Sequence, residues 1–226
     1  MKMLKAAAYV VTGVSLSFSA LAYEAGDWIV RAGVTQVAPD ESSSVVSVNG
    51  DNGAALGTNS GVGVDNDEQL GLNIQYMLNK QWGVELLAAT PFKHKVNGTG
   101  DLAGLDIGEG KQLPPTLSAV YYFDTGSAFM PYFGAGINYT VFFDAEPSDS
   151  LKSALGASKM KMDDSIGLAV QVGVDYKINT HWLVNASVRK IDIETDATID
   201  LSNGDRVDVN VDIDPYVYTL SVGYVF

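Results

Sequence analysis

The sequence contains no cysteine, which excludes a disulfide framework and any thiolate metal site. Basic residues are also scarce, because 14 Lys and Arg stand against 27 Asp and Glu, and the formal net charge is −13. Proteins bind nucleic acid through basic patches, so this balance argues against nucleic acid as a partner. Neither of the two histidines, His94 and His181, has a Ser or Cys nucleophile arranged around it. We therefore expect two solvated loop histidines, no enzymatic activity and no cofactor.

Long apolar runs are absent after residue 22, where no stretch has the ~20 residues that a membrane-spanning helix needs. Residues 1–22 hold one shorter apolar run, with Lys2 and Lys5 before it and the A-x-A pattern Ala20 to Ala22 after it. A membrane anchor and a signal peptide are the two readings, and the shortness of the run favours the signal peptide. We expect cleavage after Ala22 and one exported domain, residues 23–226.

The mature part of the chain is instead rich in segments that alternate apolar and polar residues. They cover residues 27–37, 67–78, 81–90, 112–123, 130–143, 164–176, 182–193 and 208–226. The connections between them are alternately short and long, which is typical of a bacterial outer-membrane barrel with both termini on the short-turn, periplasmic side. The predicted fold is all-β, an eight-stranded antiparallel transmembrane β-barrel. Several segments exceed the ~9 to 11 residues that cross the hydrocarbon layer, so we expect the barrel to project beyond it.

A soluble, lipocalin-like barrel would have the same number of strands, and the direction of the alternation distinguishes the two. One face of the segments is bulky and apolar, as in Leu70, Leu72 and Ile74. A closed small barrel has little room inside, so the small and polar face belongs in the lumen and the bulky face meets lipid. The expected lumen-lining residues of this face are Asn73, Gln75, Asn138, Thr140, Gln171, Asn185 and Ser187.

The aromatic residues give an independent indication of the same orientation. All three tryptophans fall at strand ends on the predicted periplasmic side. Amphipathic rings prefer the level of the lipid headgroups, so these ends predict a membrane girdle. Its expected members are Trp28, Trp82, Trp182, Tyr176, Tyr224 and Phe226.

Three charged residues share the inward face near the predicted periplasmic rim, namely Arg31, Glu85 and Asp175. A narrow barrel brings them within side-chain reach of one another. Buried charges are costly alone and tolerable when paired, so we expect Arg31 to bond Glu85 or Asp175. Such a network either closes the floor of the lumen to apolar molecules or only stabilises the barrel.

Pro114 and Pro115 lie within one predicted strand, where proline cannot donate a ladder hydrogen bond. The pair either lies above the membrane or weakens the wall, so that an apolar molecule could leave sideways into lipid.

Many acidic residues lie in the predicted external loops, for example Asp144, Glu146 and Asp149. They serve solubility or collect divalent cations that meet lipopolysaccharide phosphates, but no calcium-loop spacing is present and we expect no metal site.

Five runs closely resemble the outer membrane protein W (OmpW) family, namely "GVELLAATPFKH" (83–94), "LPPTL" (113–117), "PYFGAGINYTVFFD" (131–144), "QVGVDYKIN" (171–179) and "WLVNASV" (182–188). The resemblance implies a narrow, largely hydrophobic channel that passes small hydrophobic molecules passively. It also implies that Leu87 narrows the channel together with Arg189, which stands where the family has Trp. The C-terminal Phe226 matches the signal that barrel-assembly machinery reads in outer-membrane proteins.

Three functions remain as hypotheses. The first is a passive outer-membrane channel, whose partners are outer-membrane lipid, lipopolysaccharide and a small hydrophobic permeant. The second is a barrel with a blocked lumen that acts through its external loops, as an adhesin, a receptor or an envelope structural protein. An outer-membrane enzyme comes third, because no reactive constellation is found.

Overall fold

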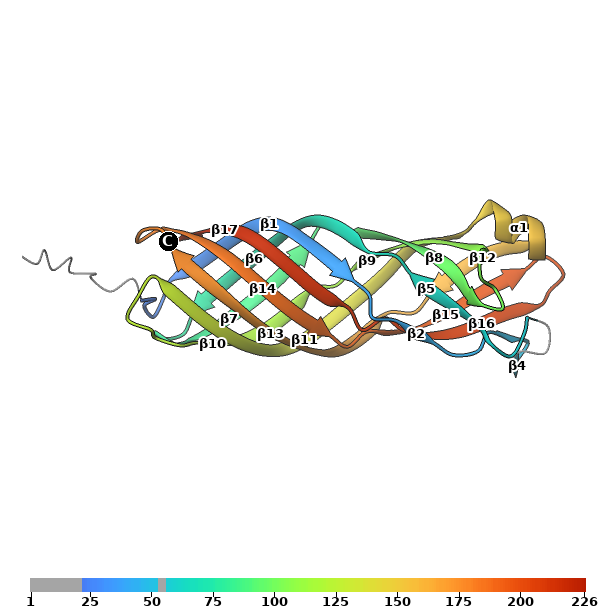
Figure 1. The fold of residues 1–226 in the computed structure, drawn as a ribbon, viewed down its shortest axis with the longest axis horizontal. Helices are drawn as coiled ribbons and strands as arrows, with labels where there is room; N and C mark the ends of the chain where they lie inside the picture. Colours follow the sequence, from blue (N-terminus) through green and yellow to red (C-terminus); the bar gives the residue numbers. More distant parts are fainter. Residues whose placement is uncertain (1–21, 53–55) are drawn as a thin grey trace, which may run out of the picture.

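A computed structural model describes residues 22–52 and 56–226. The predicted signal peptide therefore lies outside the described residues, apart from Ala22. The molecule is elongated, with a barrel at one end and a second compartment of strands at the other (Figure 1). The start of the first strand and the C-terminus lie together at the barrel end.

Eight strands form the barrel, and each pairs antiparallel with two neighbours. The strands are β1 (Trp28–Ala38), β6 (Asp67–Met77), β7 (Trp82–Ala89), β10 (Thr116–Tyr122), β11 (Phe129–Pro147), β13 (Ser165–Lys177), β14 (Trp182–Ile191) and β17 (Tyr216–Val225). Their order is β10, β7, β6, β1, β17, β14, β13, β11, and a further pairing of β10 with β11 closes the circle. The predicted eight-stranded barrel is confirmed.

The bulky apolar residues of these strands point outward, as the alternation predicts. Leu70 is 61% exposed, Leu168 69% and Leu220 69%, whereas Thr219 beside Leu220 is 9% exposed. A continuous outward apolar surface of this kind is stable only against lipid, because its exposure to water is unfavourable. The barrel therefore presents its apolar side to a bilayer and its polar side to the lumen.

The four long connections are not loops, which corrects the sequence-based expectation. They fold into β2 (Ser42–Ser43), β3 (Ser47–Val48), β4 (Asp51–Asn52), β5 (Ser60–Val64), β8 (Phe92–Gly100), β9 (Asp106–Leu113), α1 (Asp149–Leu155), β12 (Ala157–Met162), β15 (Glu194–Leu201) and β16 (Arg206–Asp212). The predicted strands 112–123 and 208–226 are each broken, the first after Leu113 and the second after Asp212. Pro114, Pro115 and Pro215 lie in these breaks, where no ladder donor is needed.

The added strands alternate in the opposite sense to those of the barrel. In β16, Val207, Val209 and Val211 are all buried, whereas Asp208 and its polar neighbours face outward. Their buried side chains join one hydrophobic core that also includes Phe92, Ile107, Leu151 and Ile199. This compartment is therefore built as a water-soluble one, apolar inside and acidic outside, and it extends the barrel beyond the membrane.

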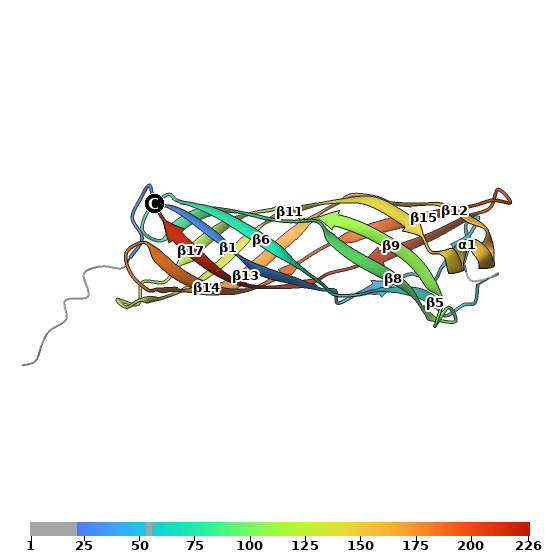
Figure 2. The same ribbon diagram turned by 90° about the horizontal axis from the view of Figure 1, so that it is seen from above.

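Two sheets enclose this outer compartment. One contains β5, β8, β9 and the end of β11, and the other contains β12, β15, β16, β3 and β4. Figure 2 shows β5, β8 and β9 of the first sheet and β12 and β15 of the second. The helix α1 covers part of the core, with Ser148 Oγ accepting from Leu151 N–H and Gly156 ending the helix at φ 70°. No backbone ladder joins β11 to β12 in the described residues, although the two strands are in contact. Within 22–52 and 56–226, no helix combines the length and apolar character needed to cross a bilayer.

The three tryptophans provide a test of how deep the barrel sits. Trp28, Trp82 and Trp182 are 51%, 44% and 48% exposed, and each ring packs against an outer tyrosine at about one level of the wall. We expect lipids brominated near the glycerol to quench tryptophan fluorescence more strongly than lipids brominated near the chain end, because a girdle lies at headgroup level. Stronger quenching by the deep bromines would contradict this placement.

Candidate channel and its polar floor

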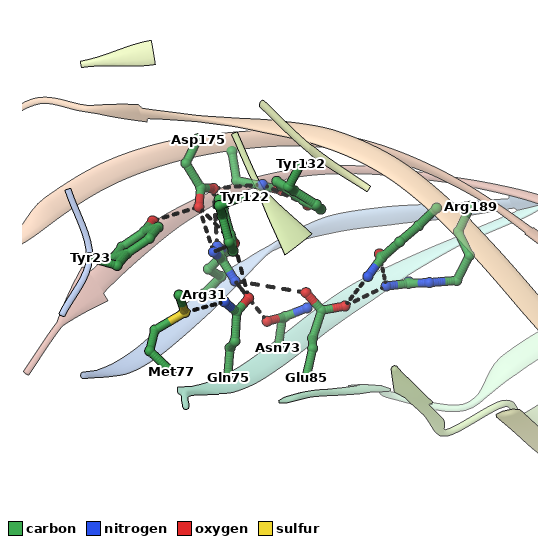
Figure 3. A network of polar contacts seen from close by, with 12 residues as sticks. Tyr23, Arg31, Asn73, Gln75, Met77, Glu85, Tyr122, Tyr132, Asp175 and Arg189 are labelled. Atoms are coloured by element: carbon green, nitrogen blue, oxygen red, sulfur yellow. Dashed lines mark hydrogen bonds and ion pairs between the residues drawn. The ribbon is translucent and has the colours of Figure 1, made fainter. Parts of the chain in front are cut away.

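Arg31 is the centre of a buried polar network in the lower lumen (Figure 3). It lies on the inward face of β1 and is 1% exposed. Its Nε and Nη2 donate to the two carboxylate oxygens of Asp175 at 3.2 and 2.6 Å. Its Nη1 donates to the side-chain oxygens of Asn73 and Gln75, both at 3.0 Å. The expected contact of Arg31 with Asp175 is therefore present, as a two-pronged ion pair.

A second ion pair lies farther up the lumen. Arg189 on β14 reaches across to Glu85 on β7, with Nη2 2.7 Å from Oε1. Gln171 joins both, because its amide donates to the same Glu85 oxygen at 2.9 Å and its carbonyl accepts from Arg189. Arg31 Nη1 lies 3.9 Å from the other Glu85 oxygen, so the two pairs are linked. Two arginines and two acids thus form one network with balanced charge.

Aromatic side chains fill the lumen around and below this network. Tyr23 donates to Asp175 at 2.6 Å, and Arg31 donates to the hydroxyl of Tyr122 at 2.7 Å. Tyr132 accepts from Asn185, which also donates to Asp175. A cluster of Tyr23, Tyr122, Tyr132 and further buried apolar residues packs beneath them. The floor of the barrel is thus filled by side chains.

These three tyrosines were not among the residues expected in the lumen. Tyr122 has the parity of Ser118, and Tyr132 has that of Gly134, so their positions on inward faces were visible in the alternation. Tyr23 precedes the first strand, and its contact with Asp175 joins residues 152 apart. No periodic signal exists for such a contact.

The expected lumen-lining residues lie on inward faces. Gln75, Asn138 and Thr140 are fully buried, and Gln171 and Asn185 nearly so, whereas Ser187 is half-buried. Leu87 is 5% exposed and lies two residues from Glu85 on the same face of β7. The two residues expected to narrow the channel, Leu87 and Arg189, therefore both project into the lumen.

Above the network the lumen becomes apolar. A cavity of about 40 Å³ lies in the outer compartment, and every side chain that lines it is apolar. They include Val62, Val96, Leu151, Met160, Met162 and Ile199. A space of this kind holds apolar groups and stays free of water, because it offers no hydrogen bonds.

His94 is buried, which corrects the expectation of a solvated loop histidine. It lies on the inward face of β8 and is 6% exposed, while its neighbours Lys93 and Lys95 point outward. Its Nδ1 is 2.6 Å from the backbone oxygen of Asp65, and its Nε2 is 2.8 Å from Nε2 of Gln112. His181, by contrast, is exposed in a turn, as expected.

The wall is interrupted at Pro114 and Pro115. The ladder between β7 and β10 ends with the pair Leu87 and Thr116, and the ladder between β8 and β9 begins with Phe92 and Gln112. Between these pairs no backbone hydrogen bond joins residues 88–91 to residues 113–115 in the described chain. The seam opens beside Leu87, at the level where the lumen changes from polar to apolar.

Within the described ranges no group of three or more His, Asp or Glu side chains is placed to hold a metal ion. Several acids of the outer compartment, including Glu194, Asp196 and Asp200, lie on the outward faces of strands. The site consists of a closed polar floor, an apolar upper lumen and a seam between them.

Comparison with known proteins places this architecture in a family. The sequence model of the OmpW family matches residues 24–226. Outer membrane protein W of Escherichia coli is 48% identical over 229 residues, which cover 100% of both chains. The crystal structure of the outer membrane protein OprG from Pseudomonas aeruginosa is 44% identical, with a TM-score of 0.84 over 91% of this chain and 98% of that one. The "Dibenzothiophene metabolism operon protein PahQ" of Pseudomonas aeruginosa is 30% identical and covers 90% of both chains. The chain therefore belongs to the OmpW family and is an outer-membrane β-barrel protein.

Proposed function

We propose that the protein is a passive channel through which small hydrophobic molecules cross the outer leaflet of the outer membrane. The observation that carries the proposal is the order of the lumen, a largely apolar compartment outside the membrane above a charged floor within it. The free energy of an apolar molecule falls when it moves from water into the compartment, by roughly 25 cal/mol for each Å² of apolar surface removed from water.

The floor determines where such a molecule goes next. To continue along the axis, it would have to separate Arg31 from Asp175 and Arg189 from Glu85, which leaves charges buried without partners. The seam at Pro114 and Pro115 lies just above this barrier and faces the apolar outer surface. The seam at these two prolines therefore acts as a lateral exit into lipid, which is the less costly path for an apolar solute.

We infer that this conformation is closed to a permeant. The apolar cavity of about 40 Å³ is smaller than the several hundred Å³ typical of ligand pockets. Passage requires the two outer sheets to part, and no ladder holds β11 to β12 in the described residues. Met160 and Met162 line the cavity beside this junction, and flexible thioether side chains adapt readily to a guest.

The relatives are consistent with an apolar permeant. The name of PahQ links that protein to the metabolism of dibenzothiophene, an apolar aromatic compound. An acidic exterior suits an entrance among lipopolysaccharide phosphates that divalent cations bridge. The rival function is a blocked barrel that acts through its outer compartment, and the filled floor favours it. Uptake measurements separate the two.

Uptake of an apolar fluorescent solute tests the channel and its exit together. Vesicles with lipopolysaccharide in the outer leaflet should take up the solute several-fold faster with the protein than without it. The double variant Pro114→Ala with Pro115→Ala supplies two ladder donors and should slow this uptake at least twofold, because the seam can close. Pro39→Ala, outside the seam, is the matched control. Equal uptake with and without protein would support the blocked barrel instead.

The polar floor should act as a seal against small polar solutes. We expect Glu85→Ala with Asp175→Asn to open axial leakage of such solutes, because both arginines lose their carboxylate partners and repel one another. Glu194→Ala with Asp196→Asn, on the outward face of β15, makes the same chemical changes as a control. If the first variant folds and leaks no more than the parent, the network only stabilises the barrel.

Arg189 should control which solutes pass the narrowest level. Arg189→Trp removes the cation that pairs with Glu85, and we expect it to raise the uptake of apolar relative to charged solutes. Glu85 then loses its closest cation, which should lower the free energy of unfolding by about 3 kcal/mol. Adding Glu85→Gln should restore most of that stability and keep the altered selectivity. An unchanged solute preference in both variants would remove Arg189 from the path.

A further inference from the structure

The hydrogen-bond partners of His94 determine which of its ring nitrogens carries the proton. The backbone oxygen of Asp65, 2.6 Å from Nδ1, can only accept a hydrogen bond, so Nδ1 carries the proton. In a neutral ring Nε2 is then an acceptor. Burial lowers the pKa of the His94 imidazole below its ordinary value, although the nearby carboxylates of Asp67 and Asp65 act in the other direction. The ring is therefore neutral at pH 7.

The neutral ring sets the orientation of Gln112. The amide nitrogen of Gln112 lies 2.8 Å from His94 Nε2 and must donate to it. The amide oxygen is thereby turned away from the histidine, and this buried Oε1 has no hydrogen-bond partner among the described residues. Gln112 is 1% exposed, so the unpaired acceptor is held in the interior and costs stability there.

Both side chains border the apolar lumen. Gln112 and His94 line a small cavity of about 20 Å³ together with Phe142 and Ile213. This cavity shares Val64, Val96 and Met162 with the larger apolar cavity, so the two are adjacent. The lumen above the floor thus has apolar walls, and at one end it is bordered by Gln112, whose buried Oε1 has no partner among the described residues.

A hydroxyl group on an apolar chain matches this arrangement better than water does. The space at the polar end is large enough for one water, which needs two to four polar partners to be well bound. A water there would leave most of its hydrogen-bonding capacity unused. An alcohol donates its one proton to Oε1 and places its alkyl chain among the apolar side chains.

We propose that Gln112 Oε1 is a binding point for permeants that carry one hydrogen-bond donor on an apolar body, such as a primary alcohol, and that His94 is the residue that positions it. This inference rests on the proposed channel function and narrows its substrate class. An acceptor-only or fully apolar molecule of the same size occupies the lumen less favourably, because Oε1 stays unpaired.

The methionine methyl groups report on the site in the intact protein. Met160 and Met162 line the cavities, whereas Met77 and Met130 lie in the cluster at the floor. Protein labelled with ¹³C at the methionine methyls, in lipid nanodiscs, is titrated with hexan-1-ol, its isomer methyl pentyl ether, and heptane. Each concentration is corrected for partition into the lipid. We expect shifts at Met160 and Met162 but not at Met77 or Met130, and a 5- to 10-fold preference for the alcohol over the ether.

Variants assign the preference to the amide. Gln112→Leu should bind heptane as well as the parent does and lose the preference for the alcohol. His94→Phe frees the amide to rotate and should reduce the preference without changing heptane binding, which a purely structural role would not predict. Gln69→Leu, a glutamine that lines neither cavity, is the control and should keep the full preference.

The outcomes separate this inference from the channel function. Equal affinity for alcohol and ether in the parent overturns the role of Gln112 and leaves the channel standing. Absence of any shift at Met160 and Met162 with all three probes overturns both. If Gln112→Leu does not fold, a nuclear Overhauser contact between the alcohol's CH₂–OH protons and the Gln112 amide in the parent decides, and its absence overturns the inference.

Discussion

The hydrocarbon layer offers no hydrogen bonds, so every backbone N–H and C=O within it must find a partner inside the protein. Eight antiparallel strands closed by the pairing of β10 with β11 meet this requirement. Closure with so few strands leaves a narrow interior, which side chains then fill. The polar and charged lumen of the membrane part is the consequence, because the outward positions are taken by residues such as Leu220 that must face lipid.

The narrow lumen also keeps its charged side chains away from bulk water, and the network shows how these buried charges are tolerated. Arg31 is matched by Asp175 and Arg189 by Glu85, and amides and phenols occupy most of the remaining hydrogen-bonding positions. Removing one partner of such an ion pair destabilises the protein by more than the pair stabilises it, because the other charge is left buried without a partner. A lumen built this way resists opening along its axis. Among the described residues, the cavity of the outer compartment is lined by apolar side chains and no ladder joins β11 to β12, so this compartment resists opening much less.

The barrel could be predicted from sequence because each of its strands carries a local two-residue period. The same period placed Arg31, Glu85 and Asp175 on inward faces and so predicted that Arg31 would be paired. Most of the outer strands were missed because their alternation has the opposite sense, with acids such as Asp196 outward, and a high acid content indicated loops. His94 was misplaced for a related reason, since its exposed neighbours Lys93 and Lys95 hid an inward position. The contact of Tyr23 with Asp175 depends on tertiary structure alone.

The long strand β11 passes from the barrel into the outer compartment, and its pairing register shifts between Phe143 and Glu146. Below the shift the even-numbered residues Asn138 and Thr140 are buried, and above it the odd-numbered Pro147 is. The bulge therefore separates two parts of one strand, in which opposite parities of residue number face inward. Inserting or deleting one residue below it would turn the lower wall inside out, whereas the same change beside it can be absorbed. Evolution can accordingly vary the length and shape of the outer compartment while the membrane part keeps a fixed residue count.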